Sequence, residues 1–409
     1  MNRQLLITFS CLFLVMVGFS IALAVLPFHV DRLATGTAIS TNAVALHVGA
    51  VTGVYALAQF ICAPLWGRWS DRQGRRAALL TGLGGFAFSQ VLFGVADTLV
   101  LLYTSRILGG VFSAAVFPIA AATVVDTLPS HQQVRGMAWL SASAALGVVA
   151  GPAFGGLLDH EVWSWMSPAG LISIDSFTIP FIALGGLSLI MLVIAARWLR
   201  EVRTPAAALS DSPSSNWFSV AIRIRGLLVL VVASQFAMAL FMTAFALYAE
   251  DRLDMGPQGI GVAFALCGLI TASVQAGGIW LVARRLSVIS QVCVGFAAMG
   301  SGLLLLPLAD SLPVVFTTIG IFVVGSALVA PSLLALIGSW SQSEAGLATG
   351  LQGSATYLGQ IIGPLSAGVL FAWRDTLPFL FAAILMLATS GWLALRHRWC
   401  TYALEKETT

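Results

Sequence analysis

The sequence has 409 residues, of which 58% are hydrophobic and only 9% are charged. Soluble domains carry charge on about 25% of their residues, so a soluble protein of this composition could not cover its surface, and most of its solvent must be lipid. The net charge of +3 is too small to indicate a nucleic-acid partner.

Long apolar runs recur along the chain, and each is a candidate membrane span because about 20 apolar residues cross a bilayer as a helix. The first six runs cover residues 5–28, 44–66, 77–96, 98–125, 136–158 and 175–196. The next six cover residues 226–249, 258–282, 286–306, 311–336, 345–371 and 375–395. The expected fold class is an all-α membrane protein with twelve transmembrane helices in two six-helix bundles.

The longest polar stretch separates the two groups of apolar runs. It contains Pro205, Pro213 and the serine-rich run Ser210–Asn216, a composition typical of loops and linkers. The predicted domains are an N-terminal six-helix bundle at 1–196, a linker at 197–225 and a C-terminal six-helix bundle at 226–409.

Basic residues are distributed unevenly over the predicted loops. If the N-terminus lies inside, the inner loops and termini hold sixteen of the 20 basic residues, and the outer loops hold only Arg32, Arg252 and Arg374. Such an excess marks the cytoplasmic side of a membrane protein. Both termini and the linker are therefore expected in the cytoplasm, with the chain in a bacterial inner membrane.

Two pairs of segments show that the two halves repeat. Ser113–Pro118 is similar to Ser326–Pro331 at an offset of 213, and Gly147–Pro152 is similar to Gly359–Pro364 at an offset of 212. Paired six-helix halves of the same orientation form one large class of transporters, whose substrates bind near the midplane between the halves. The repeat predicts that the two bundles are pseudo-symmetric.

The most distinctive local motif lies between the second and third predicted spans. It reads Gly67-Arg-Trp-Ser-Asp71-Arg72-Gln-Gly74-Arg75-Arg76, and it resembles the G-x-x-x-D-R-x-G-R-R signature of the major facilitator superfamily. The glycines permit a tight turn and a close helix approach. Plain positive-inside charge would explain the arginines but not the spacing of the aspartate and glycines.

The resemblance implies that this loop is a cytoplasmic latch, which forms in one conformation and breaks in another. Asp126 ends the fourth span, where the family often places an acid that joins the latch; the alternative is an ordinary interfacial acid. The predicted latch comprises Gly67, Asp71, Arg72, Gly74, Arg75, Arg76 and Asp126. The corresponding second-half loop, 277–285, keeps glycines and arginines but has no aspartate.

Arg106 lies within the fourth span, about 12 Å from its outer end at about 1.5 Å per residue. A charge inside a membrane normally faces a cavity or a partner. The segment from Tyr103 to Gly110 resembles the R-x-x-x-G motif of the superfamily, which implies a role in proton transfer or substrate binding. The alternative is an anchor whose charge snorkels outward.

The first span carries no charge before His29 and Asp31 at its outer end. Carboxyl and imidazole groups near lipid can titrate near neutrality. Asp31 and Arg106 are therefore the candidate residues for proton coupling. The alternative is that His29 and Asp31 are solvated loop residues.

The fifth span contains closely spaced small residues that resemble the antiporter signature of the superfamily. This resemblance implies export rather than uptake. Small residues four apart also let helices pack closely, and the eleventh span repeats GxxxGP, so helix geometry alone is the alternative. The predicted antiporter motif comprises Gly147, Gly151, Pro152, Gly155 and Gly156.

Polar and soft apolar side chains within several spans are the candidates for a substrate cavity. Methionine and aromatic rings suit varied apolar ligands, and intramembrane amides and phenols can bond to a ligand or bridge helices. Core or lipid-facing packing is the alternative. The candidates are Tyr55, Gln59, Gln235, Met238, Phe241, Met242, Phe245, Gln275, Gln352, Tyr357 and Gln360.

The motifs together resemble the twelve-span drug:proton antiporters of the superfamily, and the first half is most similar to tetracycline exporters. Those exporters carry intramembrane histidine and aspartate in spans eight and nine, and residues 258–306 hold neither there, which disfavours tetracycline as the substrate. The five cysteines include no CxxC pair, so neither a disulfide nor a zinc site is expected. No catalytic constellation or phosphate loop is present, so we expect no enzyme, no cofactor and no ATP-driven pump.

The sequence therefore predicts a proton-coupled antiporter that exports small amphiphilic compounds by alternating access. Its expected partners are an amphiphilic small molecule, protons and the lipid bilayer, and it is expected to be monomeric. One alternative is a dedicated exporter of an endogenous metabolite, such as a siderophore, a sugar or an amino-acid derivative. A membrane receptor that transports nothing is a third hypothesis.

Overall fold

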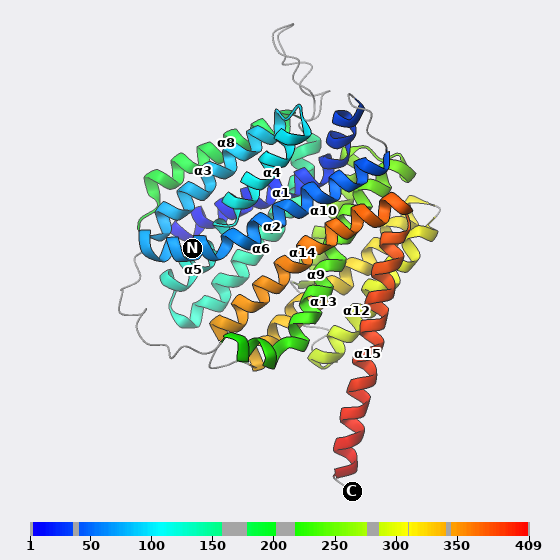
Figure 1. Cartoon of the computed structure of the whole chain (residues 1–409). Helices are drawn as coiled ribbons and strands as arrows, with labels where there is room; N and C mark the ends of the chain where they lie inside the picture. Colours follow the sequence, from blue (N-terminus) through cyan, green and yellow to red (C-terminus); the bar gives the residue numbers. More distant parts are fainter. Residues whose placement is uncertain are drawn as a thin grey trace. The chain divides into compact units, whose positions relative to one another are not determined.

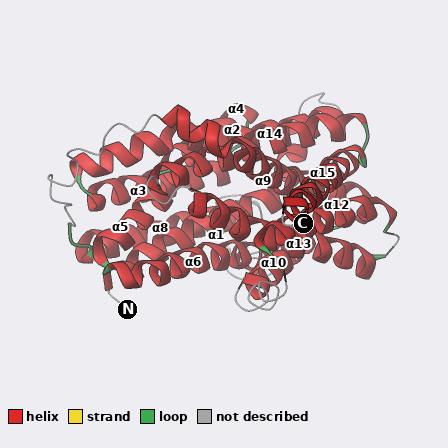
Figure 2. Ribbon diagram, turned by 90° about the horizontal axis from the view of Figure 1, so that it is seen from below, coloured by secondary structure: helices red, strands yellow, loops and turns green. Residues whose placement is uncertain are grey.

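The computed structural model describes residues 3–35, 41–157, 178–201, 217–275, 286–309, 311–340 and 345–407. Every regular element in these residues is helical (Figure 2). The α-helices are α1 (Arg3–Thr35), α2 (Thr41–Gln73), α3 (Arg75–Gly94), α4 (Leu99–Ser113), α5 (Val116–Thr127), α6 (Ser130–Leu157), α8 (Thr178–Trp198), α9 (Trp217–Leu253), α10 (Pro257–Ser273), α12 (Val288–Leu305), α13 (Leu312–Trp340), α14 (Ala345–Trp373) and α15 (Leu377–Glu407).

Ten helical segments of the described chain are long and apolar enough to cross a membrane. α6 and α10 lie at the other two predicted spans but are not among the ten. Large apolar side chains are exposed, such as Val100 at 78% and Trp373 at 79%, which suits contact with lipid rather than water. The chain is a multi-pass helical membrane protein, and the number of twelve spans stays a prediction.

One predicted span, 98–125, consists of two helices. α4 ends at Ser113 and α5 begins at Val116, with a turn at Ala114 and Ala115. Pro118 explains the position of the break, because a proline has no N–H and its ring clashes with the carbonyl group four residues earlier. That carbonyl belongs to Ala114.

The chain divides into two compact units (Figure 1). Unit 1 contains 1–211 and 245–268, and unit 2 contains 212–244 and 269–409. α9 is therefore shared between the units, and it begins at Trp217, inside the predicted linker. The domain boundaries proposed from the sequence stay a prediction.

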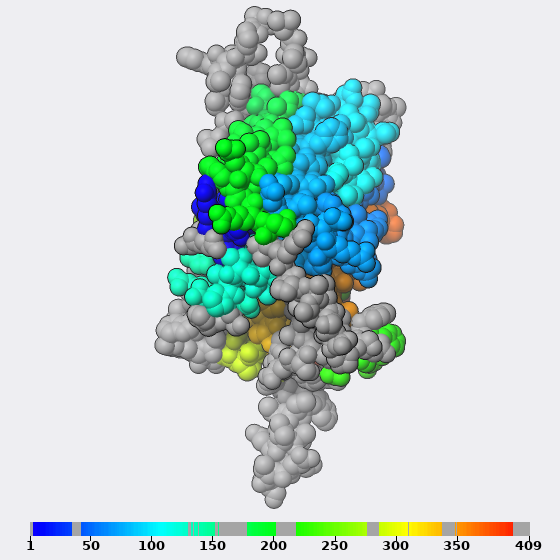
Figure 3. All heavy atoms as spheres, turned by 90° about the vertical axis from the view of Figure 1, so that its left-hand side faces the viewer, coloured from blue at the N-terminus to red at the C-terminus, as the bar shows by residue number. Residues whose placement is uncertain are grey.

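The apolar core of unit 1 joins α1, α3, α5, α6 and α8. α8 packs along α3, and Figure 3 shows these two helices side by side. The outer side of α8 is apolar as well, since Ile190 and Val193 are 58% and 66% exposed. This core fixes the start of α3 and the ends of α5 and α8, where polar contacts gather.

Candidate functional site

A single residue, Gly74, connects α2 to α3. Its backbone has φ 103° and ψ 153°, a conformation that side-chain-bearing residues rarely adopt. The Gly74 N–H donates to the Ser70 carbonyl oxygen at 2.9 Å. The turn therefore needs glycine, and it brings the last turn of α2 against the first turn of α3.

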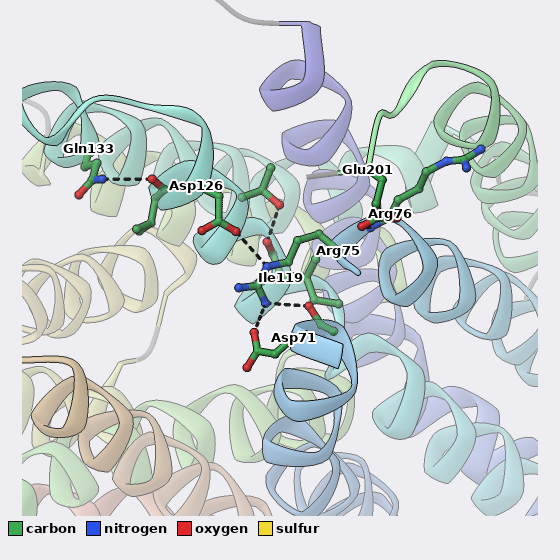
Figure 4. A network of polar contacts seen from close by, with 10 residues as sticks. Asp71, Arg75, Arg76, Ile119, Asp126, Gln133 and Glu201 are labelled. Carbon is green, nitrogen blue, oxygen red and sulfur yellow. Dashed lines mark hydrogen bonds and ion pairs between the residues drawn. The ribbon is translucent and has the colours of Figure 1, made fainter. Parts of the chain in front are cut away.

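Arg75, the first residue of α3, contacts two carboxylates (Figure 4). Its Nη1 lies 2.6 Å from Asp71 Oδ1, and its Nε lies 3.0 Å from Asp126 Oδ2. Nη1 also donates to Ser70 Oγ at 2.8 Å. The Arg75 and Asp126 side chains are only 15% and 13% exposed, whereas the Asp71 side chain is 43% exposed. The cluster ties the ends of α2, α3 and α5 together, and water screens the Arg75–Asp126 pair less than the Arg75–Asp71 pair.

A second polar contact joins the start of α3 to the end of α8. The Arg76 N–H donates to Glu201 Oε1 at 3.4 Å, and Arg76 Nη2 donates to the Ala196 carbonyl oxygen. The Glu201 carboxylate thus lies at the N-terminus of α3, and the Arg76 guanidinium lies at the C-terminus of α8. Both placements are favourable for the dipoles of these helices. A Cβ added to Gly74 would collide with the Glu201 carboxylate.

Two of the predicted latch residues lie apart from these contacts. Gly67 is inside α2, and a Cβ added there would meet no atom within 4 Å; the tight turn belongs to Gly74 alone. Arg72 is exposed. Two further residues of the site were not predicted from the sequence. Ser70 has no signal other than its place beside Asp71, and Glu201 is more than a hundred residues away from the motif in the chain.

Arg106 of α4 is buried, with 2% of its surface exposed. Its Cζ lies 4.6 Å from the centre of the Tyr55 ring and 5.3 Å from the centre of the Phe93 ring. Aromatic faces attract a guanidinium group at such distances. The side chain does not snorkel outward within unit 1, because α2 and α3 cover it.

Tyr55 is held in place by α4. Its hydroxyl donates to Ser113 Oγ at 2.8 Å, and Gln59 Nε2 donates to the same oxygen at 3.1 Å. A Cβ added at Gly110 would collide with the Tyr55 carbonyl oxygen, so glycine there lets α2 approach α4. The R-x-x-x-G spacing thus places Arg106 against an aromatic ring on the neighbouring helix.

Asp31 and His29 have different surroundings within unit 1. His29 is fully buried, and its Nε2 lies 3.0 Å from the Ala96 carbonyl oxygen. Asp31 is exposed, and its carboxylate repels that of Glu250 near the end of α9. His29 is therefore not a solvated loop residue. The proposed coupling by Asp31 and Arg106 stays a prediction.

The glycines of the antiporter motif lie at a close helix contact. A Cβ added to Gly147 of α6 would lie 2.6 Å from the Phe13 carbonyl oxygen of α1. The same contact recurs in unit 2, where a Cβ added to Gly359 of α14 would lie 2.7 Å from the Val232 carbonyl oxygen of α9. Both motifs thus form equivalent helix seams. The structure does not describe the surroundings of Pro152, Gly155 and Gly156.

The remaining substrate-cavity candidates divide between packed and partly exposed positions. Phe241 packs on Phe322, with ring centres 4.6 Å apart in unit 2, and Phe245 packs on Phe264 at 6.0 Å in unit 1.

The remaining polar candidates and the two methionines lie in unit 2. Gln360 Nε2 donates to Gln235 Oε1 at 3.5 Å, a weak bond between α14 and α9. Met238, Met242, Gln352 and Tyr357 are partly buried, and Gln275 is exposed. Contact of any of these residues with a substrate stays a prediction.

Known sequences identify the family of this fold. The family model of the Major Facilitator Superfamily matches residues 8–337. Multidrug resistance protein 1 of Bacillus subtilis (strain 168) is 28% identical over 97% of this chain and 98% of its own length. Tetracycline resistance protein, class B, of Escherichia coli is 28% identical over 81% of each chain. Quinolone resistance protein NorA of Staphylococcus aureus is 25% identical over 95% of each.

Solved structures match the fold over nearly the whole chain. A bacterial homologue of the human lysosomal transporter Spinster, in an inward-facing and occupied conformation, aligns with a TM-score of 0.77 at 14% identity and covers 97% of this chain and 98% of its own. The peptide transporter POT in complex with sulfate aligns with a TM-score of 0.76 at 15% identity, over 97% of this chain and 95% of its own.

Proposed function

Because the chain belongs to the Major Facilitator Superfamily, we propose that it exports drug-like amphiphilic molecules across a bacterial inner membrane. Its relatives over 81% or more of their length are named for resistance to multiple drugs, tetracycline or quinolones. Export of such compounds requires a membrane protein that binds small apolar molecules and exposes them to one side of the membrane at a time. The protein acts as a transporter and not as an enzyme.

The observation that carries this proposal is the cluster in which Arg75 binds Asp71 and Asp126. Asp71 and Asp126 lie near the ends of α2 and α5, and Arg75 begins α3, all in unit 1. The cluster therefore opens only if these helix ends separate. A partly buried guanidinium with two carboxylates is a suitable latch, since removing one partner leaves a poorly hydrated charge. We assign it to the cytoplasmic side, with both termini on that side.

Proton antiport is the energy source that suits this chain best. The resemblance of its motifs to drug:proton antiporters supports this assignment, as does the buried charge of Arg106. Transport then proceeds by rocking of the two halves, which exposes the substrate to each side in turn. A single chain supplies both halves, so we propose a functional monomer.

The test is dye transport into inverted vesicles with an imposed pH gradient. We expect wild-type protein to accumulate several chemically unrelated dyes only while the gradient is present. Arg106→Ala is expected to abolish gradient-driven accumulation. Arg374→Ala, at an exposed arginine of unit 2, is the matched control and is expected to transport normally.

Two results would contradict the proposal in different ways. Dye accumulation that ignores the pH gradient would contradict proton coupling but not drug export. Failure of folded wild-type protein to move any of the dyes would contradict polyspecific export and favour a dedicated metabolite exporter. A melting transition in detergent, measured for each variant, establishes that the protein is folded.

A further inference from the structure

The turn between α4 and α5 changes the pattern of backbone hydrogen bonds in the predicted fourth span. The Ala114 N–H donates to the Gly110 carbonyl oxygen, four residues earlier. The Ala115 N–H instead donates to the Phe112 carbonyl oxygen, only three residues earlier. In a continuous α-helix it would donate to the Val111 carbonyl oxygen. The turn therefore leaves that oxygen without its usual backbone donor.

A side chain of another helix supplies the missing donor. Nε1 of Trp66 in α2 donates to the Val111 carbonyl oxygen at 2.6 Å. The indole is held in place by Trp69 and Phe112, whose ring centres lie 5.2 and 6.2 Å from its own. Because this bond occupies the oxygen that the Ala115 N–H would need, it stabilises the interrupted form of the span against the continuous one.

Proline alone does not account for the interruption. Pro118 has a counterpart in Pro331, which ends the repeated segment of the second half. Pro331 lies inside α13, which continues without a break from Leu312 to Trp340. Three further prolines also lie inside continuous helices: Pro27, Pro64 and Pro364. A helix of this chain can thus contain a proline and stay continuous, so the interruption needs a second contribution, which the Trp66 bond provides.

The turn lies against two glycines of α3. A Cβ added to Gly85 would collide with the Phe112 ring, and one added to Gly82 would lie 2.6 Å from the Ala115 Cβ. Glycine inside a helix costs stability relative to alanine, and here it gives room for the close approach of the turn. The surface of α3 therefore accepts the interrupted form of the span.

The two parts of the span have different attachments within unit 1. α4 is fastened to α2 by the bonds that Tyr55 and Gln59 donate to Ser113. α5 carries Asp126, which binds Arg75 in the latch cluster (Figure 4). A short stretch of three-residue hydrogen bonding within a helix often marks a hinge. Such a hinge would let α5 move with the latch while α4 keeps its place against α2.

We propose that Trp66 is a positioning residue for transport, whose indole N–H keeps the span interrupted so that α5 can move as the latch opens. This inference rests on the latch assigned under the proposed function. Without the indole bond, the Ala115 N–H turns to the Val111 carbonyl oxygen, and α4 and α5 join into one helix. The latch then opens more slowly, because α5 has to carry α4 with it.

The first experiment measures dye transport by Trp66→Phe in proteoliposomes with an imposed pH gradient. The change removes the N–H group and keeps an aromatic ring. We expect kcat to fall about fivefold, the effect of one lost hydrogen bond, while KM stays within about twofold of the wild-type value. Trp69→Phe is the matched control, since it makes the same exchange three residues away on α2, and it is expected to transport at the wild-type rate.

Pro118→Ala tests the hinge without touching the indole. Alanine restores an N–H that can donate to the Ala114 carbonyl oxygen, which favours the continuous helix. We expect kcat to fall as in Trp66→Phe. Pro331→Ala makes the equivalent exchange in the unbroken α13 and is expected to leave kcat unchanged. Wild-type kcat in either Trp66→Phe or Pro118→Ala, or equal losses in a variant and its control, would overturn the inference.

A distance measurement detects the hinge directly and needs no transported substrate. Spin labels are attached through Val100→Cys in α4 and Val125→Cys in α5, both exposed positions, after the chain's own cysteines have been replaced. Arg75→Ala releases α5 from the latch, so we expect it to broaden the distribution of distances between the labels. Adding Trp66→Phe is expected to narrow the distribution again, because a continuous helix holds the labels at one separation.

The distances also separate the hinge from the export proposal. A distribution that Arg75→Ala leaves unchanged, or that Trp66→Phe does not narrow, would overturn the hinge even in a chain that transports dyes. The expected pattern of distances in a folded chain that moves no dye would support the hinge and contradict the export proposal alone. A melting transition in detergent, measured for every labelled variant, establishes that the compared proteins are folded.

Discussion

At the scale of single residues, the contact between Tyr55 and Arg106 gives a sharp test. Replacing Tyr55 by leucine removes the ring that lies 4.6 Å from Arg106 Cζ. A cation–π contact contributes about 1–2 kcal/mol when it is buried, so gradient-driven dye transport is expected to fall at least about fivefold in kcat/KM. Tyr55→Phe is the control, because it keeps the ring and loses only the bond to Ser113. An equal loss for phenylalanine and leucine would show that the hydroxyl group and not the ring is what transport needs.

The two glycines of the loop motif are also expected to differ. Gly74→Ala forces a left-handed backbone on alanine and brings its Cβ onto the Glu201 carboxylate. We expect it to lower the free energy of unfolding by at least about 1 kcal/mol. Gly67→Ala adds a methyl group inside a helix, where it meets nothing within 4 Å, and is expected to leave stability unchanged or to raise it slightly. Thermal unfolding in detergent measures both, and equal destabilisation would contradict this distinction.

At the scale of helices, the two GxxxGP seams are expected to behave alike. Gly147→Ala pushes a methyl group against the backbone of α1, and Gly359→Ala does the same against α9. Backbone atoms cannot move aside as side-chain ends can, so each change is expected to cost about 1–3 kcal/mol of stability. Gly350→Ala, also on α14, meets nothing within 4 Å and serves as the control. Thermal unfolding in which Gly147→Ala alone is destabilising would contradict the equivalence of the seams.

At the scale of the whole molecule, the Arg75 cluster is expected to control the rate of transport. Arg75→Ala leaves Asp71 and Asp126 without the cation that joins them. If the closed and open states differ by this contact, its loss shifts their balance and is expected to reduce initial dye uptake about tenfold. Arg68→Ala removes an exposed arginine from the same helix end and is expected to transport at the wild-type rate. Equal uptake by the two variants would show that the cluster is not a latch.

Local patterns explain how far the sequence could determine the fold. Ten described segments that can span a membrane coincide with predicted spans. A span can be predicted locally because it needs only a run of neighbouring apolar residues long enough to cross the bilayer. The glycine turn between α2 and α3 was predictable for the same reason, since the conformation is local to Gly74. The repeated GxxxGP motif also indicated the paired helix seams.

Only the tertiary structure decided which distant groups meet. Nothing in the sequence indicated that Glu201 would approach Arg76, or that Tyr55 and Phe93 would cover Arg106. Such contacts depend on how helices that are far apart in the chain pack against each other. When a helix is apolar on all sides, its hydropathy does not indicate which face turns toward which neighbour. The sequence by itself determined a transporter with a charged loop motif and a buried arginine. The packing decided that the arginine would be buried against the rings of Tyr55 and Phe93.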